Sequence, residues 1–327
     1  TAGVLLERAS WKKAYWVAAG LAVLCLVSSQ IFLPGKKKRA KVNLDIKGSS
    51  VLFVVLAAML LSFTYLQTRG LGSFLVIGLF LLSIASLFLF VRIERKASEP
   101  IILIQLFRNR VFSINLLLLL ISMLALNGYG FLMPFYMQNV LHLSTLQMGI
   151  TLAVVFGLVM AFVAPVGGAL SDKIGASRVT VIGIALLFIG TIGALLLSDG
   201  STQLAVLLHF LPIGMGIGLI VTPTTSAIMG TIPKDRLGMG ASLVSITINF
   251  AQTMGIAVLG SFWSSRVNSL LGYIPEGGAS TAPGPLQVGA LRETFILAAV
   301  LLGIGLILNI RLLRVSRYKS ADSPEST

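Results

Sequence analysis

The sequence contains little charge, one cysteine and two histidines. Only 11% of its 327 residues are Asp, Glu, Lys or Arg, whereas soluble domains carry roughly 25%. Cys25 has no partner for a disulfide, and together with His142 and His209 it is too little for a zinc site. No acidic residue lies at the depth of His209 in its apolar run. The sequence therefore lacks the acidic member that a Ser–His–acid catalytic triad requires. We therefore expect no catalytic residues, no metal site and no cofactor.

Long apolar runs dominate the chain. Hydrophobic residues make up 56% of it, and the mean hydropathy is +0.95. The runs are about 20 residues long and do not alternate, which indicates membrane-spanning helices rather than barrel strands. We predict an all-α integral membrane protein. Its nine predicted spans are Ala14–Leu33, Ser49–Gln67, Gly72–Val91, Val111–Met137, Gln147–Gly167, Val179–Leu197, Gln203–Ala227, Gly240–Trp263 and Thr294–Leu313.

The net charge of +14 comes from basic residues in alternate connections between the spans. This placement argues against a nucleic-acid partner. Because the more basic loops of a membrane protein stay in the cytoplasm, we expect the chain to start outside and end inside the cell membrane. An odd number of spans with an external start, and a first residue other than Met, lead us to expect a fragment with further helices upstream.

The connections are predicted to differ in kind. Pro34–Lys47 is a basic loop that we expect to lie on anionic headgroups. Pro100–Phe107 is apolar but too short to span, which indicates an interfacial segment. The stretch Arg266–Arg292 is rich in Gly, Pro and Ser and is predicted to be a long mobile external loop. The polar tail Ser320–Thr327 is predicted to be disordered.

A short polar turn, Gly167–Arg178, joins two of the apolar runs. It makes these runs antiparallel neighbours and places Asp172, Lys173 and Arg178 together at a helix–helix junction. A carboxylate beside helix ends and cations can hold such a junction in one conformational state and release it in another. The alternative is a solvated loop with generic charges.

Polar residues inside the spans are candidates for the wall of a solute pathway, since amides in hydrocarbon face protein or a water-filled cavity. The plain alternative is hydrogen bonding between helices, and for His209 a packed side chain is favoured over a proton relay. Gly214–Gly218 lacks the preceding strand of a nucleotide loop and indicates close helix packing. The candidates are Asn115, Asn127, Tyr129, Tyr136, His209, Asn249 and Gln252.

The polar turn resembles the loop signature of the major facilitator superfamily. Its matching positions are Gly168, Leu170, Asp172, Lys173 and Gly175. Ala176 and Ser177 replace the usual basic pair of that signature, and Arg178 follows them. The resemblance implies that these matching residues and Arg178 form a gating motif.

Further stretches resemble the fourteen-span drug:proton antiporter branch of this superfamily. They are Pro100–Arg110, Ile232–Ser242 and Gly255–Gly260. The resemblance implies the major facilitator fold, here as a C-terminal six-helix bundle with three preceding helices. The implied parts are the last helix of the N-terminal bundle with its basic loop, an extra helix pair with the interfacial linker, the six-helix bundle and a cytoplasmic tail; they cover residues 1–47, 48–110, 111–314 and 315–327.

The same resemblance implies a secondary transporter that exports drugs or other lipophilic small molecules in exchange for protons. The proton gradient would supply the energy, and the coupling carboxylate would lie in the N-terminal half, which this chain lacks. The implied partners are the lipid bilayer, a small-molecule substrate and that missing half. Proton-coupled uptake, or a non-transporting receptor or scaffold on the same fold, remain the alternatives.

Overall fold

The computed structural model describes residues 11–32, 45–69, 73–97, 102, 104–273, 275 and 277–321, and these fold almost entirely as helices. The α-helices are α2 (Trp11–Phe32), α3 (Ile46–Arg69), α4 (Phe74–Glu94), α5 (Arg110–Phe135), α6 (Thr145–Leu152), α7 (Met160–Ile174), α8 (Ala176–Ala194), α9 (Gln203–Met229), α10 (Leu237–Leu271) and α11 (Gly284–Ala321). The shorter helical segments are η1 (Ile104–Arg108), η2 (Tyr136–Val140), η3 (Ala153–Val159), η4 (Lys234–Arg236) and η5 (Ala279–Thr281).

The described residues contain eight helices long and apolar enough to cross a membrane. They correspond to the second to ninth predicted spans, so the prediction of an all-helical membrane protein is confirmed. The first predicted span coincides with α2, in which the apolar stretch of the described residues is the shorter segment Ala19–Ile31. Residues 34–44 of the predicted basic loop and residues 322–327 of the predicted tail lie outside the described residues. Both segments also contain described residues that are helical: Ile46 and Lys47 belong to α3, and Ser320 and Ala321 belong to α11.

The prediction of a long loop over residues 266–292 is wrong along most of its length. The helix α10 continues to Leu271 and α11 already begins at Gly284. Polar side chains in these extensions bond between the two helices: Arg266 forms an ion pair with Glu293, and Trp263 Nε1 donates to the Gln287 carbonyl at 3.3 Å. Arg266 and Glu293, which suggested a loop by their polarity, are thus paired within a helix pair.

Two of the membrane helices contain π-helical segments. Pro134 lacks a backbone N–H, and directly after it α5 widens into the π-helix η2 instead of ending. The fifth predicted span is built from α6, the π-helix η3 and α7 in immediate succession. The π-helical segment continues the helix beyond Pro134, so a single span runs from Arg110 to Val140.

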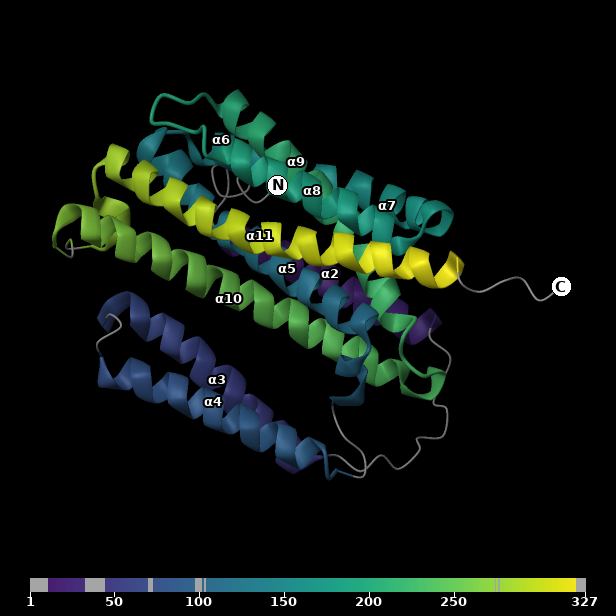
Figure 1. Cartoon of the computed structure of the whole chain (residues 1–327). Coiled ribbons are helices and arrows are strands. Elements are labelled where there is room, and N and C mark those ends of the chain that lie inside the picture. Colours follow the sequence, from purple (N-terminus) through teal and green to yellow (C-terminus); the bar gives the residue numbers. More distant parts are fainter. Residues whose placement is uncertain are drawn as a thin grey trace.

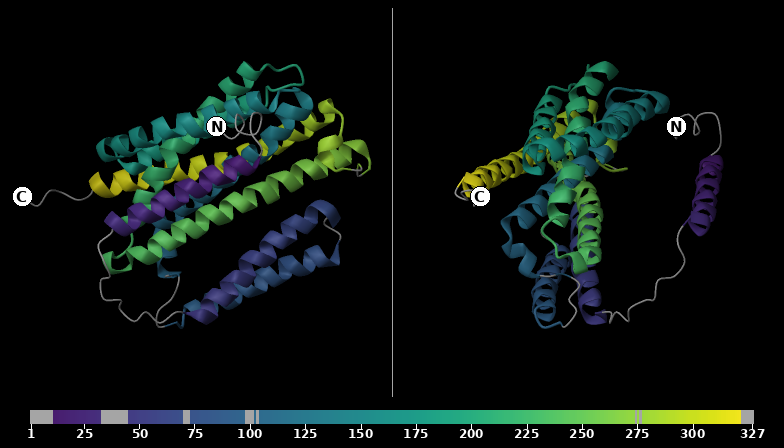
Figure 2. Two further views of the ribbon diagram at one scale, coloured as in Figure 1. Left: turned by 180° about the vertical axis from the view of Figure 1, so that it is seen from behind. Right: turned by 90° about the vertical axis from the view of Figure 1, so that its right-hand side faces the viewer.

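The helices α5 and α8–α11 pack into one elongated bundle (Figure 1). α5 contacts α9, α10 and α11, α8 contacts α9 and α11, and α7 lies against α9. The hairpin of α3 and α4 packs on α10, where Ser261 Oγ donates to the Phe63 carbonyl at 3.1 Å. α2 stands apart from the bundle (Figure 2), and its large side chains such as Leu24 are exposed.

Small residues set the closest approach in the bundle. A Cβ atom on Gly216 would lie 2.6 Å from the Gly183 carbonyl oxygen, so α8 and α9 touch through their backbones. Gly218 faces α7, where its Cβ position would lie 3.0 Å from the Val163 side chain. The glycine run 214–218 is therefore a helix-packing surface, as its apolar context predicts.

Candidate functional site

The predicted gating motif lies at the corner between α7 and α8. The predicted turn over residues 167–178 is reduced to a single residue, because α7 runs to Ile174 and α8 begins at Ala176. Gly175 has φ +90°, a backbone conformation that residues with a Cβ atom rarely adopt. Glycine at this position is therefore what lets two membrane helices meet without a loop.

The charged residues of the motif gather at this corner with exposed side chains. Asp172 and Lys173 occupy the last turn of α7, and Arg178 the first turns of α8. Among the described residues Asp172 makes no hydrogen bond or ion pair. The structure brings the predicted charges together but does not pair them, so the latch itself stays a prediction.

The glycines of the motif bring α7 onto α9. A Cβ atom on Gly167 would lie 3.1 Å from the Gly218 carbonyl oxygen, and one on Gly168 would lie 3.6 Å from Thr222 Cγ2. Leu170 is half-buried on the same helix. The motif therefore combines a tight helix contact with an open charged corner, and a motion of α7 would act directly on α9.

Three of the predicted pathway residues are buried inside the bundle. The Tyr129 hydroxyl lies 2.8 Å from Thr191 Oγ1, and its ring meets the edges of Phe210 and Phe295. Asn115 is only 1% exposed and donates to the carbonyl of its own helix at Val111. Tyr136 is also buried and donates to the Ser198 carbonyl at 2.6 Å. The two tyrosine contacts agree with the alternative interpretation, hydrogen bonding between helices, whereas the Asn115 bond stays within α5.

His209 is packed rather than open to a channel. Its Nδ1 lies 2.6 Å from the Ala205 carbonyl oxygen one turn earlier on α9. The Cβ position of Gly193 on α8 is 3.1 Å from the imidazole ring, so the ring fills the space that this glycine leaves. The geometry matches the packed histidine favoured from the sequence.

The remaining amides lie on less buried surface. Asn249 is exposed and Gln252 is half-buried, both on α10, and Asn127 is half-buried on α5. Leu124 lies opposite Gly255, and Gly128 opposite Leu259, so α5 and α10 run parallel. In this register Asn127 lies about 9 Å further along the helix axis than Gln252. The amides therefore belong to different depths of the membrane.

Asn249 is part of an exposed polar stripe on α10, formed by Ser242, Ser245, Asn249 and Thr253. These residues are spaced by three, four and four positions, so they lie on one face of the helix. Asn249 Nδ2 donates to the Ser245 carbonyl at 2.8 Å, and Thr253 Oγ1 donates to the Asn249 carbonyl at 3.0 Å. Asn249 is the one member of this stripe in the predicted site. Ser242, Ser245 and Thr253 are absent from it, although their three- and four-residue spacing along the helix could have revealed them.

The helices of this bundle, long enough to cross a membrane, define a multi-pass membrane protein. Residues 1–256 match the profile of the Major Facilitator Superfamily. The chain belongs to the major facilitator superfamily, a family of membrane transporters and not of enzymes.

The chain is similar to several characterised transporters. It is 25% identical over 270 residues to the multidrug transporter protein MdtP of Bacillus subtilis, which is 82% of this chain and 50% of that protein. It is 26% identical over 313 residues to the riboflavin transporter RibZ of Clostridioides difficile, covering 95% and 66%. With the multidrug resistance protein Stp of Mycobacterium tuberculosis it shares 25% over 294 residues, covering 90% and 54%. The chain thus spans about half to two thirds of these relatives.

Proposed function

We propose that this chain is the C-terminal part of a secondary transporter that exports lipophilic small molecules in exchange for protons. Its similarity to MdtP and Stp supports export of drug-like compounds. Its partial coverage of these relatives supports a second half outside this chain, which would carry the proton-coupling carboxylate. Substrate would then bind near the midplane between two bundles that rock around it.

The polar stripe on α10 is the observation that carries this proposal. Ser245, Asn249 and Thr253 are exposed along a helix that is otherwise long and apolar enough to span a membrane. Polar groups within the hydrocarbon region are costly unless they face protein or water. A stripe of this kind therefore suits the wall of a solute pathway, covered by the opposite bundle in one state and wetted in another.

The charged corner between α7 and α8 supports alternating access. Asp172 is exposed and without a partner among the described residues, so a second surface can engage it in another conformational state. We propose that Asp172 holds the α7–α8 corner closed by interacting with neighbouring helix ends and cations. The basic loops of the chain favour the cytoplasmic side of the membrane for this corner.

Efflux of a fluorescent lipophilic cation from cells that lack other drug pumps tests the proposal. The full-length natural transporter should lower accumulation of the dye, and an uncoupler of the proton gradient should abolish this effect. Thr253→Val should slow efflux about fivefold, because one hydrogen-bonding group worth about 1 kcal/mol leaves the pathway.

Thr64→Val is a matched control for that variant. Thr64 is also exposed on a membrane helix and also donates to the carbonyl four residues earlier, Leu60, at 2.9 Å. It lies on α3, outside the proposed pathway, and its replacement should leave efflux unchanged. Equal effects of the two variants would contradict a pathway along α10.

Proton-coupled uptake is the second candidate function. The riboflavin transporter RibZ covers 95% of this chain at 26% identity, as high as the identity to the drug exporters. Uptake predicts that expression raises the accumulation of a substrate and that uncoupling lowers it. A full-length protein that moves no substrate in either direction would instead favour a receptor or scaffold on this fold.

A further inference from the structure

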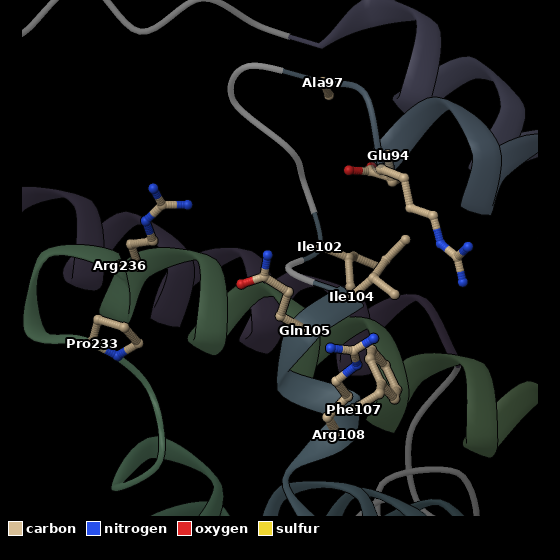
Figure 3. A pocket seen from close by; sticks show the side chains of 10 residues that line it. Glu94, Ala97, Ile102, Ile104, Gln105, Phe107, Arg108, Pro233 and Arg236 are labelled. Atoms are coloured by element: carbon tan, nitrogen blue, oxygen red, sulfur yellow. The ribbon is translucent and has the colours of Figure 1, made fainter.

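A cavity of about 940 Å³ lies where the end of α4, the segment η1 and the start of α10 come together. Figure 3 shows Gln105 and Arg108 on η1, Arg236 near Pro233, and Glu94 at the end of α4. The lining residues are Glu94, Arg95, Ala97, Ile102, Ile104, Gln105, Phe107, Arg108, Pro233 and Arg236. The cavity thus joins the extra hairpin, the interfacial segment and the six-helix bundle.

The lining of this cavity is positively charged. Among the described residues, Arg95, Arg108 and Arg236 contribute guanidinium groups, and Glu94 contributes the one carboxylate. Asp235 approaches only Nε of Arg236, at 3.6 Å, and its side chain is 77% exposed. The terminal donors of Arg236 therefore stay available, and a guanidinium presents its donors in a fork that fits a phosphate group.

A groove of about 490 Å³ adjoins the cavity and shares Arg95 with it. Its described lining residues are Phe88, Val91, Arg92, Arg95 and Lys96, and none of these is acidic. Phe88 is 74% exposed on the outer face of α4. Along this surface, apolar side chains on a membrane helix are followed by a cluster of cations. An anionic phospholipid has the matching arrangement, because its apolar acyl chains are followed by a negatively charged headgroup.

We propose that the cavity and the groove together bind an anionic phospholipid. The headgroup occupies the cavity, whose lining carries Arg95, Arg108 and Arg236, and an acyl chain follows Phe88 and Val91 along α4. A free phosphate would use the guanidinium groups but not the apolar half of the site. The bound lipid would link the extra hairpin to the bundle, because residues of α4, η1 and η4 line the same cavity.

Native mass spectrometry of the full-length transporter tests this site directly, without reference to transport. Phosphatidylglycerol should be retained in preference to phosphatidylcholine. The triple variant Arg95→Gln, Arg108→Gln and Arg236→Gln should bind phosphatidylglycerol about a hundredfold more weakly, since each cation near a lipid surface contributes about fivefold. Arg69→Gln, at the opposite end of the hairpin, is the matched control and should keep wild-type binding.

Two more variants distinguish a bound lipid from a bound phosphate and from a misfolded protein. Lysine at the three arginine positions should restore part of the binding, because it returns the charge but not the guanidinium fork; this recovery distinguishes a loss of charge from misfolding. Phe88→Ser should weaken the binding of phosphatidylglycerol but not of inorganic phosphate. Equal retention of the two lipids, unchanged binding in the glutamine variant, or unchanged phosphatidylglycerol binding in Phe88→Ser would each overturn the proposal.

Discussion

The hydroxyl groups of Tyr129 and Thr191 lie 2.8 Å apart in the core of the bundle and join α5 to α8. Thr191 also donates to the Leu187 carbonyl on its own helix at 2.8 Å, so its hydroxyl oxygen can accept the tyrosine proton. The Tyr129 ring packs at the same time against Phe210 and Phe295. This residue therefore connects four helices, and its contacts are those of a structural side chain.

Tyr129→Phe should lower the stability of the protein while leaving transport intact. The ring contacts remain and Thr191 keeps its bond to Leu187, so the loss is that of one buried hydrogen bond, about 0.5–1.5 kcal/mol. Thermal unfolding of the purified protein measures this effect. Tyr273→Phe, at a side chain that is 62% exposed, should leave the unfolding midpoint in place. A loss of transport in Tyr129→Phe without a loss of stability would instead support a role for Tyr129 in the solute pathway.

Gly216→Ala should disrupt the crossing of α8 and α9. The new Cβ atom would lie 2.6 Å from the Gly183 carbonyl oxygen and 2.7 Å from the Leu187 nitrogen, and neither backbone atom can move away cheaply. Poor expression and a lower unfolding midpoint are expected. Gly78→Ala on α4 is the control, because nothing lies within 4 Å of its Cβ position. There the substitution should stabilise the helix by up to about 1 kcal/mol.

Asp172→Asn should abolish transport by the full-length protein without affecting its folding. The side chain is exposed and has no partner among the described residues that the substitution could break. Asp199→Asn is the matched control, since Asp199 is also exposed but follows α8 at its other end. Transport at the wild-type rate in Asp172→Asn would rule out the latch, whereas equal losses in both variants would point to a general need for surface charge.

Arg292→Gln should loosen the turn between α8 and α9. The Arg292 guanidinium donates to the Leu197 carbonyl from Nε at 3.1 Å and from Nη2 at 2.9 Å. Loss of these bonds should speed amide hydrogen exchange across residues 197–201 by about fivefold, for a local cost of about 1 kcal/mol. Arg311→Gln, at the far end of α11, should leave exchange in this turn unchanged; no difference between the variants would contradict the clamp.

The helical membrane architecture follows from the sequence with little ambiguity. Continuous apolar runs leave the backbone no partner in the membrane except itself, so helices are the allowed solution. The single-glycine corner at Gly175 lies within the predicted polar turn. The extensions of α10 to Leu271 and of α11 from Gly284 were missed, because polar residues that bond to a neighbouring helix look like loop residues when their sequence is considered alone.

The candidate site was harder to predict than the fold. Asn115, Asn127 and Asn249 all donate to the carbonyl four residues earlier, at 2.8, 2.9 and 2.8 Å. The three amides therefore make the same hydrogen bond within their own helices. Their surroundings differ nonetheless: Asn115 is 1% exposed, Asn127 is half-buried and Asn249 is exposed. A membrane sequence hides this difference, because lipid-facing and core-facing positions are both apolar and leave no clear periodicity.

The sequence by itself determined that this protein spans a membrane as helices, and its motifs determined the superfamily. Hydrophobicity and the need to pair every backbone group suffice to predict membrane-spanning helices. The glycines and the acidic residue at the α7–α8 corner indicate the superfamily. Only the tertiary structure decided that Tyr129 belongs to the core, that the polar residues of α10 form one exposed stripe, and that Arg95, Arg108 and Arg236 share a cavity. These facts depend on which helices meet and in what register, which separate apolar spans do not encode.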